Sequence, residues 1–207
     1  MKPLKEKKPA TVEEPILHLS QLDPEGIYTY ADYLRWQFED RLELIKGRIF
    51  KMSPAPNTSH QRISAAFLFQ LYGFFLGKPC AVFAAPFDVR LPISKKKGQI
   101  TTVVQPDLCV ICDPAKIDEK GCLGAPDLIV EILSPGNSKP EMRIKFDVYQ
   151  EAGVREYWMV HPLDRMVIVY ILNENGRFIG LQPVTEDTEL RPALFPDLVI
   201  DLKEVFA

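Results

Sequence analysis

Four charged residues stand where the surrounding sequence predicts a protein interior or its edge: Glu43, Asp107, Glu131 and Lys145. Glu131 lies in the middle of 128–133, a short apolar run rich in branched side chains that is typical of a buried strand. A buried charge costs several kcal/mol unless it is paired or bound to a cation. Mg²⁺ takes oxygen ligands, usually one or two carboxylates together with water and substrate phosphates. The four residues together therefore predict a site for a hard divalent cation.

Lys145 belongs to a predicted helix that follows the turn at 134–137 and ends at Gly153. At about 100° per residue, the apolar side chains of this helix form one stripe, made of Met142, Phe146, Tyr149 and Ala152. Lys145 falls on the same side of the helix. Either its long side chain lies at the edge of the stripe and reaches water, or it faces the same cavity as Glu131.

Each acid also has a simpler interpretation, as a surface-facing residue on a half-exposed strand, and this fits Glu131 least well. A second Pro-Asp pair competes with Pro106-Asp107, because Asp127 lies on the same predicted strand as Glu131. At about 3.3 Å per residue, the separation of four positions between Asp127 and Glu131 spans roughly 13 Å, too far for both to bind one Mg²⁺. Asp107 lies on a different strand, which can sit beside Glu131, and we therefore choose Asp107.

The order of the predicted elements indicates an α/β (α+β) domain, in which helices cover the faces of a mixed β-sheet. Residues 1–15 are predicted to be a flexible tail and 16–207 a single domain. Hairpins are predicted near both ends of that domain, around Lys46-Gly47 and Asn175-Gly176. The other predicted elements are a helix from Thr29 to about Asp40, a helix capped by Ser59, strands at 80–91 and 101–112, a polar loop at 113–125, and a strand, helix and strand from 128 to 160.

Composition and charge limit the kinds of partner and the cellular compartment that we expect for this protein. The chain has 207 residues and a net charge of −3, so contact with nucleic acid requires a local basic patch, for which Lys95, Lys96 and Lys97 are the best run. No apolar stretch has the roughly 18 to 20 residues that span a bilayer, and the N-terminus lacks the apolar core of a signal peptide. We therefore expect a cytoplasmic protein with no membrane contact. Its four cysteines are expected to be buried reduced thiols, because nothing near Cys109 and Cys112 completes a metal or redox site.

Five segments in this order resemble the Uma family of restriction-endonuclease-like proteins, within the PD-(D/E)XK nuclease superfamily. They are LELIKGRI at 42–49, MSPAPNTSHQRI at 52–63, QPDLCV at 105–110, PDLIVEILSP at 126–135 and KFDVYQEAGVREYW at 145–158. The resemblance covers roughly 28–201 and implies a restriction-endonuclease-like core. Leu133 stands where the superfamily pattern has its lysine, and the family resemblance implies that this lysine has moved to the following helix, as Lys145.

The resemblance implies a Mg²⁺-dependent endonuclease, with Mn²⁺ as an alternative metal, that hydrolyses phosphodiester bonds in DNA. The implied catalytic residues are Glu43, Asp107, Glu131 and Lys145. Asp107, Glu131 and the main-chain carbonyl of Ile132 are the implied metal ligands, and Glu43 completes the metal shell through water. A homodimer is also expected, because many endonucleases of this type cut two strands with two copies.

Further residues are candidates for contact with substrate phosphate: His60, Arg143 on the predicted helix, and the lysines at 95–97. His60 is either a surface histidine in a capping turn or a group that reaches substrate phosphate. Asp88 is a further acid that could approach from a neighbouring strand. Two other functions stay open from the sequence. One is a nuclease-fold module that binds nucleic acid or a partner without cutting. The other is a hydrolase of small phosphorylated molecules, although this sequence lacks the Gly-rich phosphate-binding loop expected for such an enzyme.

Overall fold

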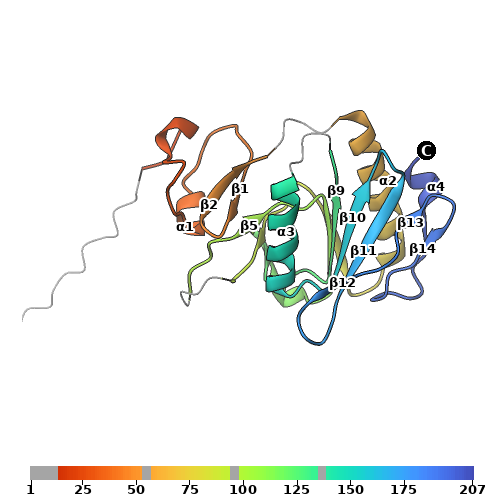
Figure 1. The fold of residues 1–207 in the computed structure, drawn as a ribbon. Helices are drawn as coiled ribbons and strands as arrows, with labels where there is room; N and C mark the ends of the chain where they lie inside the picture. The colour runs from red at the N-terminus through yellow and green to blue at the C-terminus, as the bar shows by residue number, and fades with distance from the viewer. Residues whose placement is uncertain (1–13, 53–56, 94–97, 135–138) are drawn as a thin grey trace, which may run out of the picture.

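The structure, a computed structural model, describes residues 14–52, 57–93, 98–134 and 139–207, without the side chains of 139–141. Most of the predicted tail and the lysines at 95–97 lie outside these residues. The described strands form two large sheets and one small sheet, and Figure 1 shows the helices α2 (Thr58–Phe75) and α3 (Lys139–Ala152) beside the larger of them. Mixed sheets flanked by helices confirm the predicted α/β (α+β) class.

The larger sheet carries the predicted strand–helix–strand unit. Its described strands lie in the order β12 (Phe178–Gly180), β11 (Met166–Leu172), β10 (Glu156–His161), β9 (Leu128–Ile132), β6 (Leu108–Ile111) and β3 (Ala81–Ala84), and β13 (Val184–Thr185) also pairs with β11. β9 and β10 are parallel, with Glu131 opposite Met159, because α3 returns the chain to the same end of the sheet. β6 runs antiparallel to β9 on its other side. The pairing of β11 with β12 confirms the predicted C-terminal hairpin.

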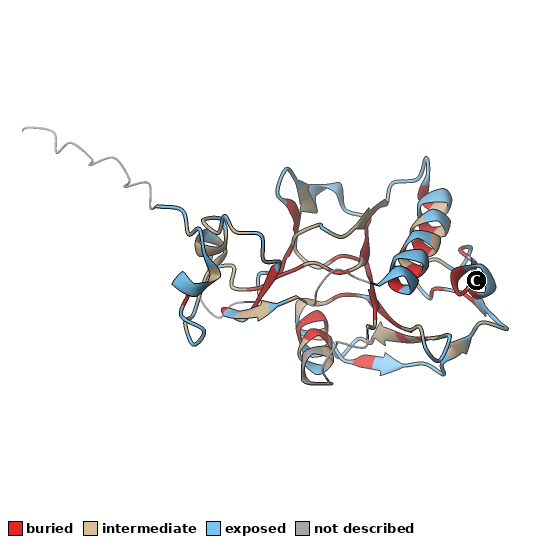
Figure 2. Ribbon diagram, turned by 90° about the horizontal axis from the view of Figure 1, so that it is seen from above, coloured by how far each residue is buried: buried red, intermediate tan, exposed pale blue. Residues whose placement is uncertain are grey.

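Alternation along β9 divides its side chains between two cores. Val130 packs in the core that contains the buried face of α2, whereas Ile129 packs in the core that contains α3. Glu131 shares the α3 side with Ile129 and so points toward the helix that carries Lys145. Figure 2 shows α2 and α3 on opposite sides of the strands, each with buried positions along its length.

The second large sheet holds Glu43. Its described strands lie in the order β2 (Arg48–Lys51), β1 (Leu42–Ile45), β5 (Val103–Val104), β4 (Val89–Arg90), β8 (Gly121–Leu123) and β7 (Ile117–Asp118). The antiparallel pairing of β1 with β2 confirms the predicted hairpin, and Lys46 and Gly47 at its turn both have positive φ. All four residues of β1 are buried.

Two predicted strands are each divided between these sheets, which corrects the prediction. The strand predicted at 101–112 consists of β5 and β6, and the one predicted at 80–91 consists of β3 and β4. Pro106 and Pro86 lie in the two gaps, and proline has no N–H to donate to a sheet ladder. The polar loop predicted at 113–125 also contains the short strands β7 and β8.

The predicted N-terminal helix is much shorter than expected. Thr29 caps it as predicted, but α1 spans only Tyr30–Tyr33 rather than reaching Asp40. Residues 35–37 instead hydrogen-bond to the extended chain at Ile16. This long-range pairing overrides the local helical pattern.

The second helix follows its prediction more closely. α2 begins slightly earlier than expected, because Asn57 rather than Ser59 is its N-cap. The chain ends with β14 (Glu189–Leu190), β15 (Ile200–Asp201) and α4 (Leu202–Val205), the last two of which pack against α2. No helix in the described ranges is long and apolar enough to cross a membrane.

One pair of cysteines forms a disulfide, so the expectation of four reduced thiols was wrong. Cys80 is bonded to Cys112. The register of β3 and β6 pairs Ala81 with Ile111, and this sets the next residues outward, the two cysteines, opposite each other. Such a long-range pairing leaves no trace in local sequence spacing. Cys109 and Cys122 are free and buried, as predicted.

Candidate active site

Three acids and one lysine meet where the chain passes between the two large sheets. Glu43 comes from β1 in one sheet and Glu131 from β9 in the other. Asp107 lies in the crossing segment 105–107, immediately before β6. Lys145 is on the face of α3 that covers β9. Residues that are far apart in sequence are thus brought together by the joining of the sheets.

The Lys145 ammonium group links the two glutamates. Its Nζ lies 2.9 Å from Glu43 Oε1 and 3.0 Å from Glu131 Oε1. The exposed fraction is 9% for Lys145, 2% for Glu43 and 9% for Glu131. The alternatives in which Lys145 reaches water, or the two glutamates face the surface, are therefore wrong. The interpretation that Lys145 faces Glu131 is confirmed.

Asp107 is held by the main chain and by a histidine. Its Oδ2 accepts a hydrogen bond from the Ile132 N–H at 2.7 Å and lies 3.3 Å from His60 Nε2. Because Ile132 follows Glu131 in β9, this hydrogen bond brings Asp107 close to the second acid. His60 is buried, which excludes the interpretation of it as a surface histidine.

Among the described residues, hydrogen bonds and ion pairs engage a single oxygen of each acid. Glu43 Oε1 accepts from the Gln105 N–H at 2.9 Å as well as from the lysine. Glu131 Oε1 accepts from the Tyr149 hydroxyl at 2.5 Å as well as from the lysine. Asp107 is engaged through Oδ2. Within the described part of the chain, the hydrogen bonds of the three acids thus converge on one oxygen of each carboxylate.

Negative charge exceeds positive charge in this cluster. Three carboxylates accompany one ammonium, which leaves two negative charges unbalanced before His60 is counted. Burial raises the pKa of Glu131 to about 7 against the opposing effect of Lys145. The charges of Asp107 and Glu43 add to this increase. The cluster therefore takes up a proton, or another cation, near neutral pH.

Lys145 stays protonated despite its burial. Burial by itself lowers the pKa of this ammonium group, but the carboxylates of Glu131 and Glu43 outweigh that effect and raise the pKa above its usual value. For His60, burial likewise lowers the pKa, whereas the hydrogen bond to Asp107 and the aspartate charge raise it, with a net increase. The acids around them thus favour the protonated forms of both Lys145 and His60.

A family model that covers residues 30–203 matches this sequence, and it describes the Uma2 family as "Putative restriction endonuclease". The chain belongs to the Uma2 family. An uncharacterized protein from Synechocystis sp. is 24% identical over 159 residues, which is 75% of this chain and 80% of that protein. A crystal structure from Anabaena variabilis, titled a putative nuclease belonging to DUF820, matches 86% of this Uma2 chain and 97% of its own chain, with a TM-score of 0.68 and 21% identity. This likeness shows that the two chains share a fold.

The remaining sequence-predicted residues of this Uma2 chain lie outside the cluster. Asp127, the competing acid, accepts a main-chain N–H at 2.8 Å and pairs with Arg155 at 3.0 Å, so it joins neighbouring segments of structure. Asp88 is connected to the cluster through Gln105, whose side-chain Nε2 donates to Asp88 Oδ1 at 2.8 Å. Arg143 is exposed on α3. The lysines at 95–97 lie outside the described residues, and their role stays a prediction.

Two residues of the cluster were not among the candidates from sequence. Tyr149 was assigned to the apolar stripe of α3, yet it follows Lys145 by four residues, a spacing that places two side chains on one helix face. That spacing is the signal that could have identified it. Gln105 acts on Glu43 through its main-chain N–H, for which the side-chain type gives no signal.

The donor set of the cluster fits a hard divalent cation. Carboxylate oxygens and a main-chain carbonyl such as that of Ile132 are the ligand types that Mg²⁺ takes. Within the described ranges, no three acidic, histidine or cysteine side chains form a pre-arranged metal-binding group. The Lys145 ammonium lies between Glu43 and Glu131 and partly balances their charge. The charge that it leaves unbalanced is of the sign and size that a divalent cation neutralises.

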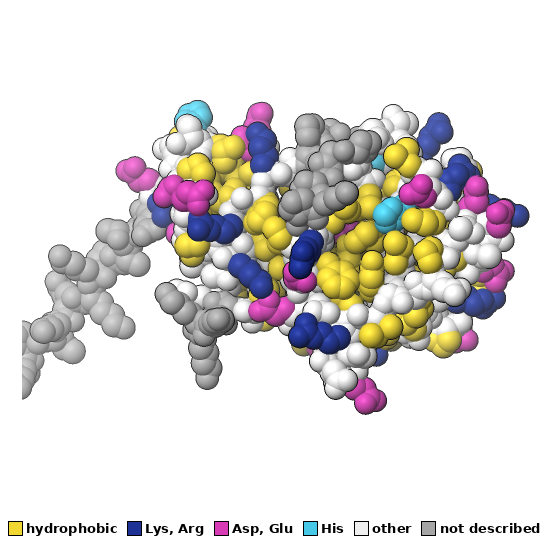
Figure 3. All heavy atoms as spheres, viewed as in Figure 1, with side chains coloured by type: hydrophobic (Ala, Val, Ile, Leu, Met, Phe, Trp, Pro, Cys, Tyr) yellow, Lys and Arg dark blue, Asp and Glu magenta, His cyan; other side chains and the backbone are white. Residues whose placement is uncertain are grey.

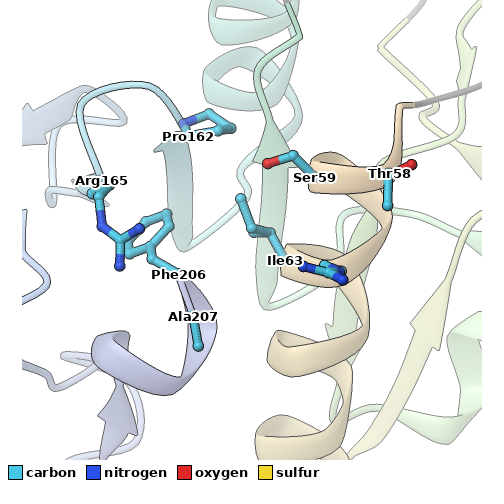
Figure 4. Close-up of a pocket in the computed structure, with 8 residues that line it drawn as sticks. Thr58, Ser59, Ile63, Pro162, Arg165, Phe206 and Ala207 are labelled. Carbon is cyan, nitrogen blue, oxygen red and sulfur yellow. The ribbon is translucent and has the colours of Figure 1, made fainter.

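A cavity of about 260 Å³ lies beside the start of α2 and is separate from the acidic cluster. Figure 4 shows Ser59 and Ile63 on one side of it and Pro162 and Arg165 on the other. None of the three clustered acids lines it, and Arg165 is paired with Glu186. The acids, rather than this cavity, are therefore the candidate site of chemistry.

Proposed function

We propose that this Uma2 protein is a Mg²⁺-dependent endonuclease that hydrolyses phosphodiester bonds in DNA. The meeting of Glu43, Asp107 and Glu131 around one buried lysine carries the proposal. The description of the Uma2 family supports the reaction class. An excess of carboxylates at one place supports the metal, because Mg²⁺ binds such oxygens together with substrate phosphate.

The proposed roles follow from the contacts of each residue. Asp107 and Glu131 would hold Mg²⁺ together with the carbonyl of Ile132, and Glu43 would contribute through a water molecule. Bound Mg²⁺ supplies polarisation of the phosphoryl oxygen and a lowered pKa for a metal-bound water. The Lys145 ammonium would stabilise the negative charge that develops on the phosphorus oxygens, in a buried place where such an interaction is strong.

Contact with DNA has to be local, because Figure 3 shows acidic and basic side chains interspersed over the face that carries α3. Arg41 is well placed for such a contact. It is exposed, it lies two residues before Glu43 and so on the same side of the extended chain, and its Nη2 donates to Gln105 Oε1 at 3.0 Å. No carboxylate among the described residues is paired with Arg41. We therefore add Arg41 to Arg143 and 95–97 as proposed contacts to backbone phosphates.

We also propose that the protein acts as a homodimer, because two copies of one active site can cut the two strands of a duplex. The proposed cutting of DNA and the proposed dimer are independent, since a monomer that cuts one strand would still produce nicked DNA.

A plasmid assay tests the proposed activity. The native protein is expected to convert supercoiled plasmid to nicked or linear DNA with Mg²⁺ or Mn²⁺, and to leave it intact when both metals are chelated. Glu131→Gln is expected to leave the plasmid uncut, although its amide oxygen can still accept from Tyr149 and Lys145. A native protein that binds DNA and Mg²⁺ but never cuts would instead indicate a non-catalytic module.

Mg²⁺ binding is expected to be about tenfold weaker at pH 6 than at pH 8, because a ligand must be deprotonated before it binds metal. Burial raises the pKa of Glu131 to about 7, so this carboxyl group is mainly protonated at pH 6 and mainly ionised at pH 8. Affinity should therefore rise with pH through pH 7 and then level off. Calorimetric titration with MgCl₂ measures it, and an affinity that is constant from pH 6 to pH 8 would exclude Glu131 as a ligand with this pKa.

Arg41→Ala is expected to weaken DNA binding uniformly across sequences and to reduce its salt dependence. Loss of one phosphate contact lowers the slope of log affinity against log salt by about 1. The measurement is fluorescence anisotropy with a labelled duplex, on a Glu131→Gln background. Arg191→Ala is the matched control, because Arg191 is also exposed but pairs with Glu189 near the C-terminus. Equal slopes for the two variants would remove Arg41 from the interface.

A further inference from the structure

Tyr149 is a buried polar residue that the proposed mechanism does not use. Its side chain is fully buried, and its hydroxyl donates to Glu131 Oε1 at 2.5 Å. The same oxygen accepts from Lys145 Nζ at 3.0 Å. Two donors from successive turns of α3 therefore converge on one oxygen of the acid.

The hydroxyl of Tyr149 is held in place by the packing of its ring. The ring packs edge-on against Tyr157, with 5.3 Å between the ring centroids, inside the core that α3 forms with the sheet. A ring fixed in this way cannot follow Glu131 if the carboxylate rotates. The hydrogen bond therefore restricts the carboxylate to the orientation in which Oε1 faces α3.

A purely structural role does not account for the hydroxyl group. The packing of the ring needs only an aromatic side chain, which phenylalanine would supply without a buried polar group to satisfy. The hydroxyl makes its contact with the one acid that lies in the middle of a buried strand. Both donors engage Oε1, and the hydrogen bonds of the described residues do not engage Oε2, so Oε2 is the oxygen of Glu131 that a cation would bind.

We propose that Tyr149 is a positioning residue that fixes the Glu131 carboxylate so that Oε2 is presented to the metal. This inference rests on the proposed function, because it assigns Tyr149 to the same Mg²⁺ site. Partners that orient metal ligands in this way typically change metal affinity by about 10- to 100-fold when they are removed. Tyr149 touches neither metal nor substrate and acts through Glu131.

The test is Mg²⁺ titration of Tyr149→Phe by calorimetry. We expect the Kd for Mg²⁺ to rise at least about tenfold, while plasmid cutting returns to near the native rate at saturating Mg²⁺. A variant with damaged packing would not recover in this way. Tyr157→Phe is the matched control, because Tyr157 is equally buried in the same core and none of its described contacts is a hydrogen bond to Glu131. It should keep the native Kd.

A second measurement uses the native protein and does not depend on the folding of a variant. Addition of Mg²⁺ should perturb the near-ultraviolet absorbance of a tyrosine with the same Kd as the calorimetric titration, and Tyr157→Phe should retain this signal. If the native protein binds Mg²⁺ and Tyr149→Phe binds it equally well, the positioning role is overturned while the proposed function stands. If the native protein does not bind Mg²⁺ at all, both are overturned.

Discussion

Lys145→Ala is expected to lower the free energy of unfolding at pH 8 by about 3–5 kcal/mol and to abolish DNA cutting. The substitution leaves Glu43 and Glu131 buried without the ammonium group that lies within 3.0 Å of both. Breaking a buried ion pair by removing one partner costs this much because the remaining charge has neither water nor a counter-ion. Urea denaturation of the native and variant proteins, with and without Mg²⁺, measures the effect. Added Mg²⁺ should restore part of the lost stability, since it supplies the missing positive charge.

The control for this prediction is Lys46→Ala. Lys46 pairs with Glu151 at 2.5 Å, but both side chains are about half exposed. An exposed pair of this kind contributes at most about 1 kcal/mol. If the two substitutions destabilise the protein equally, the buried cluster does not have the electrostatic character described above. If Lys145→Ala folds normally and cuts like the native protein, the assignment of the lysine is wrong.

Asp107→Asn is expected to reduce the rate of plasmid cutting by about 10³-fold or more. Loss of a carboxylate ligand removes metal-dependent stabilisation of several kcal/mol, and each 1.36 kcal/mol corresponds to a factor of ten in rate. The amide oxygen of asparagine can still accept from the Ile132 N–H, so the fold should be retained. Initial rates at saturating Mg²⁺, together with the melting temperature, separate the loss of catalysis from a loss of structure.

Asp127→Asn is the matched control, because Asp127 is the aspartate of the second Pro-Asp pair in the chain. It accepts a main-chain N–H and pairs with Arg155, so its replacement should affect stability more than cutting. We expect native cutting rates from this variant at a temperature where it is folded. The reverse result, with Asp127→Asn inactive and Asp107→Asn active, would move the metal site to the other end of β9.

Local sequence patterns predicted the parts of the site that depend on one element at a time. Branched apolar residues around Glu131 predicted a buried strand, and periodicity placed Lys145 on the apolar side of the next helix, either at its edge or facing Glu131. Both are correct, because burial of a strand and of one helix face follows from side chains that are neighbours in sequence or one turn apart. The hairpin of β1 and β2 was predicted for the same reason, since its turn contains Lys46-Gly47.

Which of these elements meet depends instead on packing between segments that are far apart in sequence. The break at Pro106 sends β5 and β6 to different sheets, and the short crossing between them carries Asp107 to the edge of β9. The burial of Glu43 follows from the position of β1 at this junction, not from its own pattern of neighbours. The Cys80–Cys112 disulfide depends in the same way on the pairing of β3 with β6.

Tyr149 shows most clearly which contacts a local sequence pattern can predict and which it cannot. Helical periodicity predicted that this residue lies on the apolar face of a helix, and its burial in the core beside α3 confirms that prediction. Its hydroxyl reaches Glu131 because α3 packs against β9, the strand that carries this acid. A periodic pattern reports which side of an element is buried, whereas a buried hydrogen bond requires the position of a partner from another element.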